Sequence, residues 1–236
     1  MAQQGTSPWI YVGCGCLALV GITIATCVGV GFMGYQQVRD ISENMADPVA
    51  RADKAREVLG ADELPPGYNA QFALSIPWIM DMVVISDQAP IEGELDSIDL
   101  HNLGDSALLY FEFPDFGEQR KELRRFLEGE TDHPNINMEV DIDFDPEKVL
   151  SRGRFDLGDT ELFYAVFSGD IRSDKGRREG LQSMFLLECP DEERFRLATW
   201  FRSYPETMTP EDAASEYADE PTLRQFMSHF APCRNR

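Results

Sequence analysis

The sequence predicts an α+β fold, with an N-terminal transmembrane helix followed by one mainly antiparallel sheet covered by helices. Two observations lead to this prediction. Residues 9–35 form a long apolar run without a charged side chain. The rest of the chain is mostly a series of short apolar segments that succeed one another without helical crossovers, and such consecutive strands pair antiparallel.

The N-terminal run, residues 9–35, reads WIYVGCGCLALVGITIATCVGVGFMGY. A helix needs about 20 apolar residues to cross the hydrocarbon core. Aromatic rings favour the headgroup region, which suits Trp9, Tyr11 and Tyr35 near the ends. A cleaved signal peptide is the alternative, since residues 24–27 resemble a lipoprotein processing box. The run has no basic n-region and continues beyond that box, so we expect an uncleaved anchor.

Small residues line one side of this predicted span. Gly21, Ala25 and Gly29 recur every four residues and therefore share one helix face, where a second helix can approach closely. We expect the span to contact the lipid bilayer through residues 9–35. Packing against a protein partner or a second copy through this face is one interpretation of the small residues, and the general frequency of glycine in membrane spans is the alternative.

Charge is distributed unevenly along the chain. Lys and Arg total 21 and Asp and Glu total 42, which gives a net charge of −21, and every charged side chain lies at or after Arg39. So acidic a surface repels phosphates and argues against a nucleic-acid partner. Counted literally, the positive-inside rule places the domain in the cytoplasm. Bacterial N-terminal anchors more often direct the attached domain across the membrane, so the side of the membrane stays open.

The chain is predicted to have four parts. Residues 1–38 hold the tail and the transmembrane helix, 39–63 a connector with a short helix, 64–204 the α+β domain, and 205–236 a helical extension. In the connector, Asp47 before a proline reads as an N-cap, so the short helix is predicted over residues 48–59, with Gly60 closing it.

Apolar runs and breakers predict the elements of the domain. The predicted strands are Gln71–Ile76, Met80–Ser86, Ala107–Phe113, Met138–Phe144, Arg154–Leu157, Leu162–Ser168 and Leu181–Glu188. The predicted helices are Glu118–Leu127, with Leu123, Phe126 and Leu127 on its apolar side, Pro190 to about Ser203, and two short helices that begin after Thr209 and before Pro221. The acidic stretch between residues 87 and 105 is expected to form an exposed loop.

Three features of the domain resemble a family of uncharacterised bacterial proteins with a single N-terminal span. They are the Leu64–Tyr68 breaker LPPGY before an apolar strand, the block LLYFEFP at Leu108–Pro114, and the strand pair from Gly153 to Ser168 followed by MFLLEC. The resemblance covers roughly residues 48–203. It implies a compact α+β domain and no particular activity, because these motifs are structural.

Two charged segments are candidates for binding. Glu139–Asp145 alternates acidic and apolar residues, which suggests cation binding, but a calcium loop needs Gly at the position of Pro146, so a solvated strand face is the preferred interpretation. Basic residues cluster in the internal helix and in the loop Arg172–Arg178, where ordinary surface pairing is the alternative to an anionic partner. No nucleophile, phosphate-binding, cofactor or metal motif is present in the sequence.

Cys189 and Cys233 are the two cysteines of the domain. We hypothesise that they form a disulfide that fastens the chain end, which would place the domain on the oxidising side of the membrane; two separate thiols in the cytoplasm are the alternative. The sequence as a whole suggests a membrane-tethered, non-enzymatic interaction or accessory domain. The rival interpretation is a membrane-bound hydrolase with a site built from scattered carboxylates.

Overall fold

The computed structural model separates residues 1–44 from a second, compact unit of residues 45–236. It describes residues 46–76, 78–90, 104–114, 117–131, 144–173, 176–190 and 194–233. The predicted membrane span, with Gly21, Ala25 and Gly29, lies outside these residues. Within them, no helix is long and apolar enough to cross a membrane.

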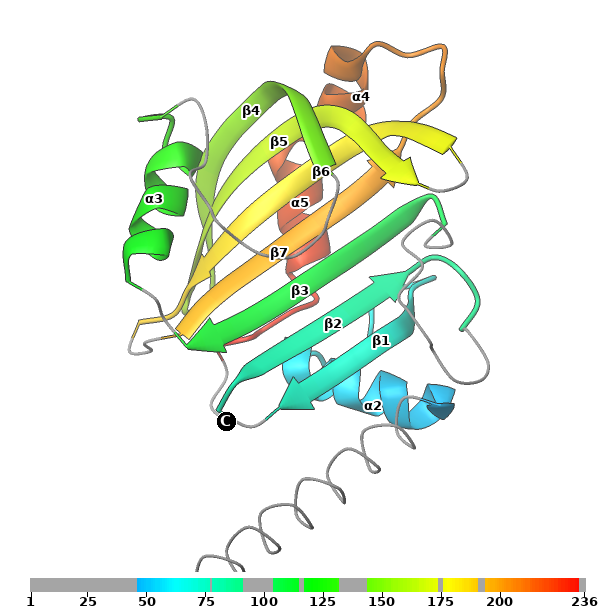
Figure 1. Ribbon diagram of the computed structural model, residues 1–236, viewed down its shortest axis with the longest axis vertical. Helices are drawn as coiled ribbons and strands as arrows, with labels where there is room; N and C mark the ends of the chain where they lie inside the picture. Colours follow the sequence, from blue (N-terminus) through cyan, green and yellow to red (C-terminus); the bar gives the residue numbers. More distant parts are fainter. Residues whose placement is uncertain are drawn as a thin grey trace, which may run out of the picture. The chain divides into compact units, whose positions relative to one another are not determined.

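The second unit is built on one seven-stranded antiparallel sheet with the order β1-β2-β3-β7-β6-β5-β4 (Figure 1). The strands are β1 Asn69–Ile76, β2 Met80–Ser86, β3 Ser106–Pro114, β4 Phe144–Leu157, β5 Thr160–Ser173, β6 Gly176–Glu188 and β7 Arg194–Ser203. The first three strands form one meander and the last four form another. The chain passes from β3 to the far edge, and the second meander returns until β7 pairs with β3.

Three helices cover one face of the sheet: α2 (Pro48–Leu59), α4 (Pro210–Tyr217) and α5 (Glu220–Met227). In Figure 1, α5 lies behind the strands. Leu59, Ala213 and Phe226 of these helices are buried in the larger of the hydrophobic clusters. There the Phe226 ring stacks on Trp200 of β7, with 4.0 Å between the ring centroids. The Asp47 side chain accepts from Val49 N, Thr209 caps α4 and Asp219 caps α5, so each helix begins at a side-chain cap.

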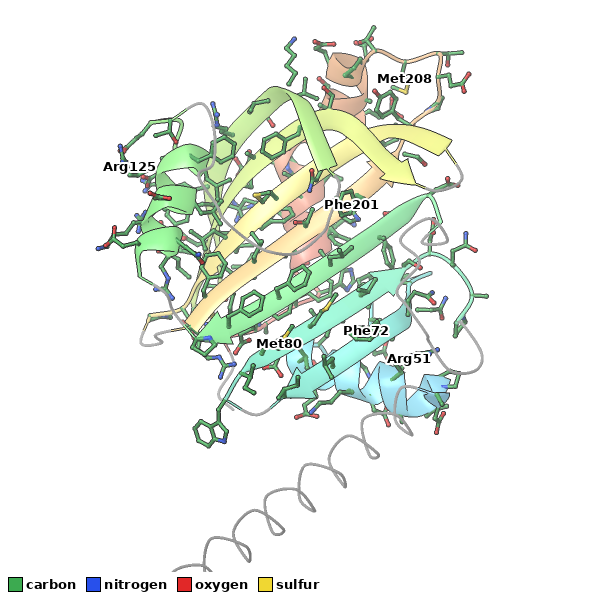
Figure 2. All side chains as sticks on the ribbon, in the orientation of Figure 1. Arg51, Phe72, Met80, Arg125, Phe201 and Met208 are labelled. Carbon is green, nitrogen blue, oxygen red and sulfur yellow. A yellow bond between two sulfur atoms is a disulfide. The ribbon has the colours of Figure 1, made fainter. Side chains whose placement is uncertain are left out.

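On the opposite face, the described residues form one helix, α3 (Glu118–Leu127), which packs on β5 and β6. Leu123, Phe126 and Leu127 are buried there. The same face continues over β1, β2 and β3 as a second apolar cluster that includes Phe72 and Leu109, with Phe201 partly exposed beside them. Figure 2 labels Phe72 and Phe201 on this part of the sheet.

The structure confirms the α+β class, the antiparallel sheet and four of the predicted helices. Helix α2, its left-handed Gly60 cap and α3 have the predicted bounds. The short C-terminal helices are present, and both bury side chains in the core of the unit of residues 45–236.

The predicted helix from Pro190 to Ser203 is wrong, because residues 194–203 form strand β7. β7 is a central strand that pairs with β3 and β6 and buries side chains on both faces. Phe195 and Leu197 face the α3 side, whereas Ala198 and Trp200 face the opposite side. This period of two outweighs the acidic residues after Pro190 that favoured a helix start.

The predicted strand Arg154–Leu157 is too short, and of the predicted strand Met138–Phe144 only Phe144 is described. Strand β4 runs without interruption from Phe144 to Leu157. Residues 138–143 lie outside the described part of the chain. Two shifts of register against β5, between Pro146 and Lys148 and between Val149 and Ser151, weaken the alternation that would have marked the middle of β4 as a strand.

Candidate functional site

An exposed aromatic side chain stands at the turn between β1 and β2. A hydrogen bond of 3.0 Å from Ile79 N to Ile76 O closes the turn, and Trp78 has a φ of 69°. Trp78 is 89% exposed and Ile79 is 59% exposed. A bulky residue at positive φ is an outlier, since turns of this kind normally place Gly or Asn there. Residues 76 and 78–80, called the hairpin tip below, therefore combine local strain with apolar exposure.

The apolar surface of the hairpin tip continues down the strands. Ile76 pairs with Met80 and Leu74 pairs with Met82, and all four side chains are partly exposed. They lie on the sheet face of the Phe72 cluster, because the side chains of a strand alternate between faces. Figure 2 labels Met80 at this end of β2.

An ionic cluster lies directly behind the hairpin tip. Asp81 of β2 is paired in register with Glu112 of β3, which is paired with Arg196 of β7. Glu112 is 2% exposed, and its two oxygens lie 2.6 Å from Arg194 Nε and 3.2 Å from Arg196 Nε. Arg194 also lies 3.6 Å from Asp81, and Tyr110 donates a hydrogen bond of 2.8 Å to Glu112.

This cluster contains two carboxylates and two guanidinium groups, so its formal charge is zero. Removing one partner of such a buried set leaves an uncompensated charge and typically costs about 3–5 kcal/mol. The cluster ties β2, β3 and β7 together at the base of the hairpin. It therefore holds the tip in a fixed position rather than offering a free carboxylate for chemistry.

Cys189 and Cys233 are joined by a disulfide with 5.5 Å between their Cα atoms. Arg196 Nη1 donates to Cys189 Sγ at 3.0 Å, and Thr160 Oγ1 donates to Cys233 Sγ at 2.8 Å. Ala231 N also donates to Leu59 O at 3.1 Å, which lays the last residues along the end of α2. A Cβ on Gly60 would stand 2.2 Å from Ala231 O, so this close approach requires glycine.

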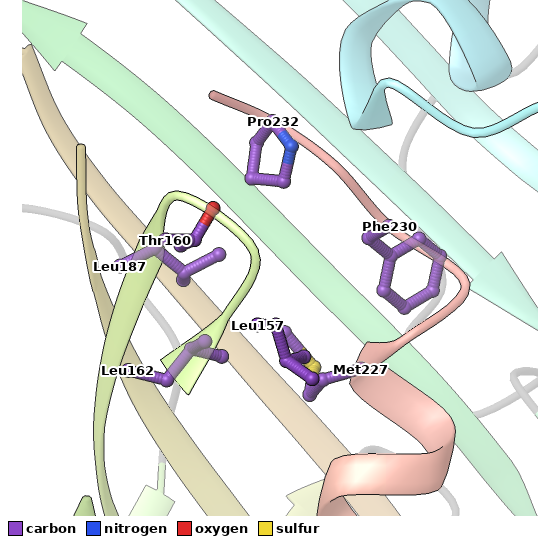
Figure 3. A pocket seen from close by; sticks show the side chains of 7 residues that line it. All are labelled: Leu157, Thr160, Leu162, Leu187, Met227, Phe230 and Pro232. Atoms are coloured by element: carbon purple, nitrogen blue, oxygen red, sulfur yellow. The ribbon is translucent and has the colours of Figure 1, made fainter. Parts of the chain in front are cut away.

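A small hollow lies beside the disulfide, since Thr160, which donates to Cys233, is part of its lining; Figure 3 shows the lining residues. Its lining is apolar except for the Thr160 hydroxyl, and consists of Leu157, Thr160, Leu162, Leu187, Met227, Phe230 and Pro232. The hollow measures about 170 Å³ including space open to solvent, and it leaves no room for a water molecule inside. Its shape is that of a packing defect under the chain end rather than of a substrate pocket.

The basic residues of α3 are in ion pairs or hydrogen bonds. Arg124 pairs with Glu188 of β6 at 3.1 Å and Arg125 pairs with Glu130 at 3.1 Å. Arg120 donates to the backbone oxygen of Arg194, which fixes the start of α3 beside the start of β7. Burial raises the pKa of the Glu188 carboxyl above its ordinary value, and the guanidinium of Arg124 acts in the opposite direction.

Other candidates from the sequence have only partial descriptions. Of the acidic segment Glu139–Asp145, residues 139–143 lie outside the described part, and the structure does not describe the side chains of residues 144 and 145. Of the predicted basic loop Arg172–Arg178, residues 172–173 end β5 and residues 176–178 begin β6, and its side chains are likewise not described. Within the described residues, no group of three or more His, Cys, Asp or Glu side chains could hold a metal ion.

Sequence reasoning missed the hairpin tip and the ionic cluster. Trp78 was detectable as a bulky aromatic residue, after a proline, where a turn between two predicted strands needs Gly or Asn. Glu112 was detectable as one charge inside the apolar block LLYFEFP. Its partners Arg194 and Arg196 were hidden, because they come from the segment that was predicted as a helix.

No protein-family model matches this chain, and no curated protein matches it at a significant level. The resemblance to single-span bacterial proteins therefore stays an expectation, and function has to be inferred from the geometry of the hairpin tip, the ionic cluster and the disulfide.

Proposed function

We propose that this chain is a membrane-tethered, non-enzymatic interaction domain on the oxidising side of its membrane, and that the hairpin tip is its binding element. The observation that carries the proposal is Trp78, which is 89% exposed at a φ of 69°. Strained backbone clusters at functional sites because folding alone does not favour it. Gly or Asn at this turn position would leave the backbone less strained, so the presence of tryptophan points to a role in binding.

The tether in this proposal is the charge-free run of residues 9–35. Its length fits the hydrocarbon core, and Gly21, Ala25 and Gly29 offer a face for a second helix in the membrane. The unit of residues 45–236 is compact without this run, which is what a tethered domain requires.

The side of the membrane is inferred from the disulfide between Cys189 and Cys233. Such bonds persist in oxidising compartments and are rare in the cytoplasm. Arg39 is the only Lys or Arg within ten residues after the predicted span, so the positive charge that opposes this orientation is small.

The rival function, a hydrolase built from scattered carboxylates, lacks a specific observation in its favour among the described residues. The most deeply buried carboxylates, Asp81 and Glu112, lie in ion pairs with Arg194, and Glu112 also pairs with Arg196. To act as a general acid or base, Asp81 or Glu112 would have to reach a substrate. The hollow beside the disulfide has no room for a substrate.

Site-specific photo-crosslinking in native membranes tests the proposal. A benzophenone side chain replaces Trp78 in one variant and exposed Glu206, which comes after β7 at the other end of the sheet, in the other. We expect adducts, whether to protein or to lipid, from the Trp78 position and few from the Glu206 position. Equal adduct yields at both positions, or a chain that is absent from the membrane fraction, would refute the proposal.

A further inference from the structure

We infer that the hairpin tip inserts into the headgroup region of the same bilayer that holds the predicted anchor, so that the domain lies down on the membrane. This inference rests on the proposed function and names the target of its binding element. Three observations lead to it: the chemistry of the tip, its neutrality, and its distance from the tether.

The chemistry of the tip suits an interface between water and hydrocarbon. Trp78 is a large ring with one polar N–H, and Ile79 beside it is 59% exposed. Tryptophan is enriched in the headgroup region of bilayers, because its amphipathic ring satisfies both environments there. Ile76 and Met80, at the two ends of the tip, are partly exposed, so the apolar surface continues from the tip onto the sheet.

The tip is also neutral within a strongly acidic chain. Residues 74–80 read LSIPWIM and hold no charge, whereas the whole chain carries −21. The next residue, Asp81, is buried and lies 3.6 Å from Arg194. Charged groups resist transfer out of water, so this protrusion can approach lipid without carrying a charge into it.

The tether is long enough to permit the contact. Arg51 Nε donates to Ala70 O, which places the first turn of α2 beside the start of β1. β1 has 8 residues, so the tip lies about 26 Å farther along the sheet. Residues 36–47, between the predicted span and α2, reach at most about 43 Å when fully extended. The attachment converts insertion into an intramolecular event, so a weak contact is enough.

The experiment uses the full chain in nanodiscs of phosphatidylcholine brominated on its acyl chains, which quenches tryptophan near lipid. Trp9 is changed to Phe in all samples, since the predicted anchor would place it in the bilayer. Trp200 is 4% exposed in the core and supplies a constant background. Three variants are compared: Trp78 retained, Trp78→Phe, and Trp78→Phe with Glu206→Trp, which moves the ring to the opposite sheet end.

The inference predicts that bromination quenches the emission of Trp78 and that little quenching remains in the Trp78→Phe variant. The tryptophan introduced at position 206 in the third sample should emit like a ring in water. Equal quenching at both positions, or a Trp78 that is unquenched, would overturn the inference. Blue-shifted but unquenched Trp78 emission would indicate burial against a protein, so the inference would fail while the proposed function stands. A chain that does not co-purify with the discs would refute both.

Discussion

Removal of the Cys189–Cys233 disulfide should destabilise the domain by up to about 4 kcal/mol. The two cysteines are 44 residues apart, and the chain-entropy model assigns that value to a loop of this size. The double variant Cys189→Ala, Cys233→Ala is the right perturbation, because it leaves no free thiol. Phe230 and Pro232 remain buried in it, so the native fold should persist and the loss should come mainly from a less restricted unfolded chain.

Urea unfolding of residues 39–236, followed through the buried Trp200, measures this loss. We expect the fragment to be soluble and folded, because residues 45–236 form their own compact unit. It contains only the two domain cysteines, so reduced wild type is a matched control that should behave like the double variant. A difference below about 1 kcal/mol between the oxidised wild type and the variant would refute the stabilising role assigned to the bond.

Three further predictions concern side chains of the same fragment. Trp78→Asn should raise the free energy of unfolding by about 1 kcal/mol, because Asn accepts positive φ, while Ile79→Asn should change it little; a loss with Trp78→Asn would contradict the strain argument. Glu112→Ala should cost about 3–5 kcal/mol in urea unfolding, because it removes the carboxylate that pairs with Arg194 and with buried Arg196 and leaves a net positive charge in the cluster, whereas Glu211→Ala, at the exposed pair with Lys148, should change the stability little. Burial raises the pKa of the Glu188 carboxyl, so the folded state binds the carboxyl proton more tightly than the unfolded chain does. The stability that this proton contributes is fully present below the unfolded pKa and is lost as pH rises through the folded pKa. Glu188→Gln should therefore gain stability relative to wild type between acidic and neutral pH, and a relative loss over that range would show that the ion pair with Arg124 outweighs burial.

Local signals in the sequence determine much of this fold. Helices α2, α4 and α5 begin at Asp47, Thr209 and Asp219, whose side chains accept backbone N–H groups that the helix leaves unpaired. Strand β2 was predicted with its observed bounds because its apolar run is flanked by breakers. Both kinds of signal lie within a few residues of the element that they define.

Strand β7 shows where local signals fail. Its segment begins after Pro190 and three acidic residues, which favour a helix start when they are read alone. Its conformation depends on partners far away in sequence, since Glu112 and Phe111 of β3 stand opposite Arg196 and Leu197. Tertiary pairing of this kind overrides propensity, and a single sequence does not show it.

The candidate site also contains features that the sequence shows and features that it does not show. The disulfide could be hypothesised from the sequence, because Cys189 and Cys233 are the two cysteines outside the predicted span, with two separate thiols as the alternative. The ionic cluster was not accessible, because it assembles from three strands, with Asp81, Glu112 and Arg194 spread over more than one hundred residues. Trp78 was visible, but its meaning depends on a backbone angle that only the structure gives.

Thiol labelling of intact cells tests the central claim, a tethered domain on the oxidising side, most directly. The full chain with Cys14, Cys16 and Cys27 changed to Ser reports only on Cys189 and Cys233. The account predicts that the chain fractionates with membranes and that a membrane-impermeant maleimide labels it only after reductant is added. Labelling without reductant, and only by a membrane-permeant reagent, would place two free thiols in the cytoplasm and contradict the account.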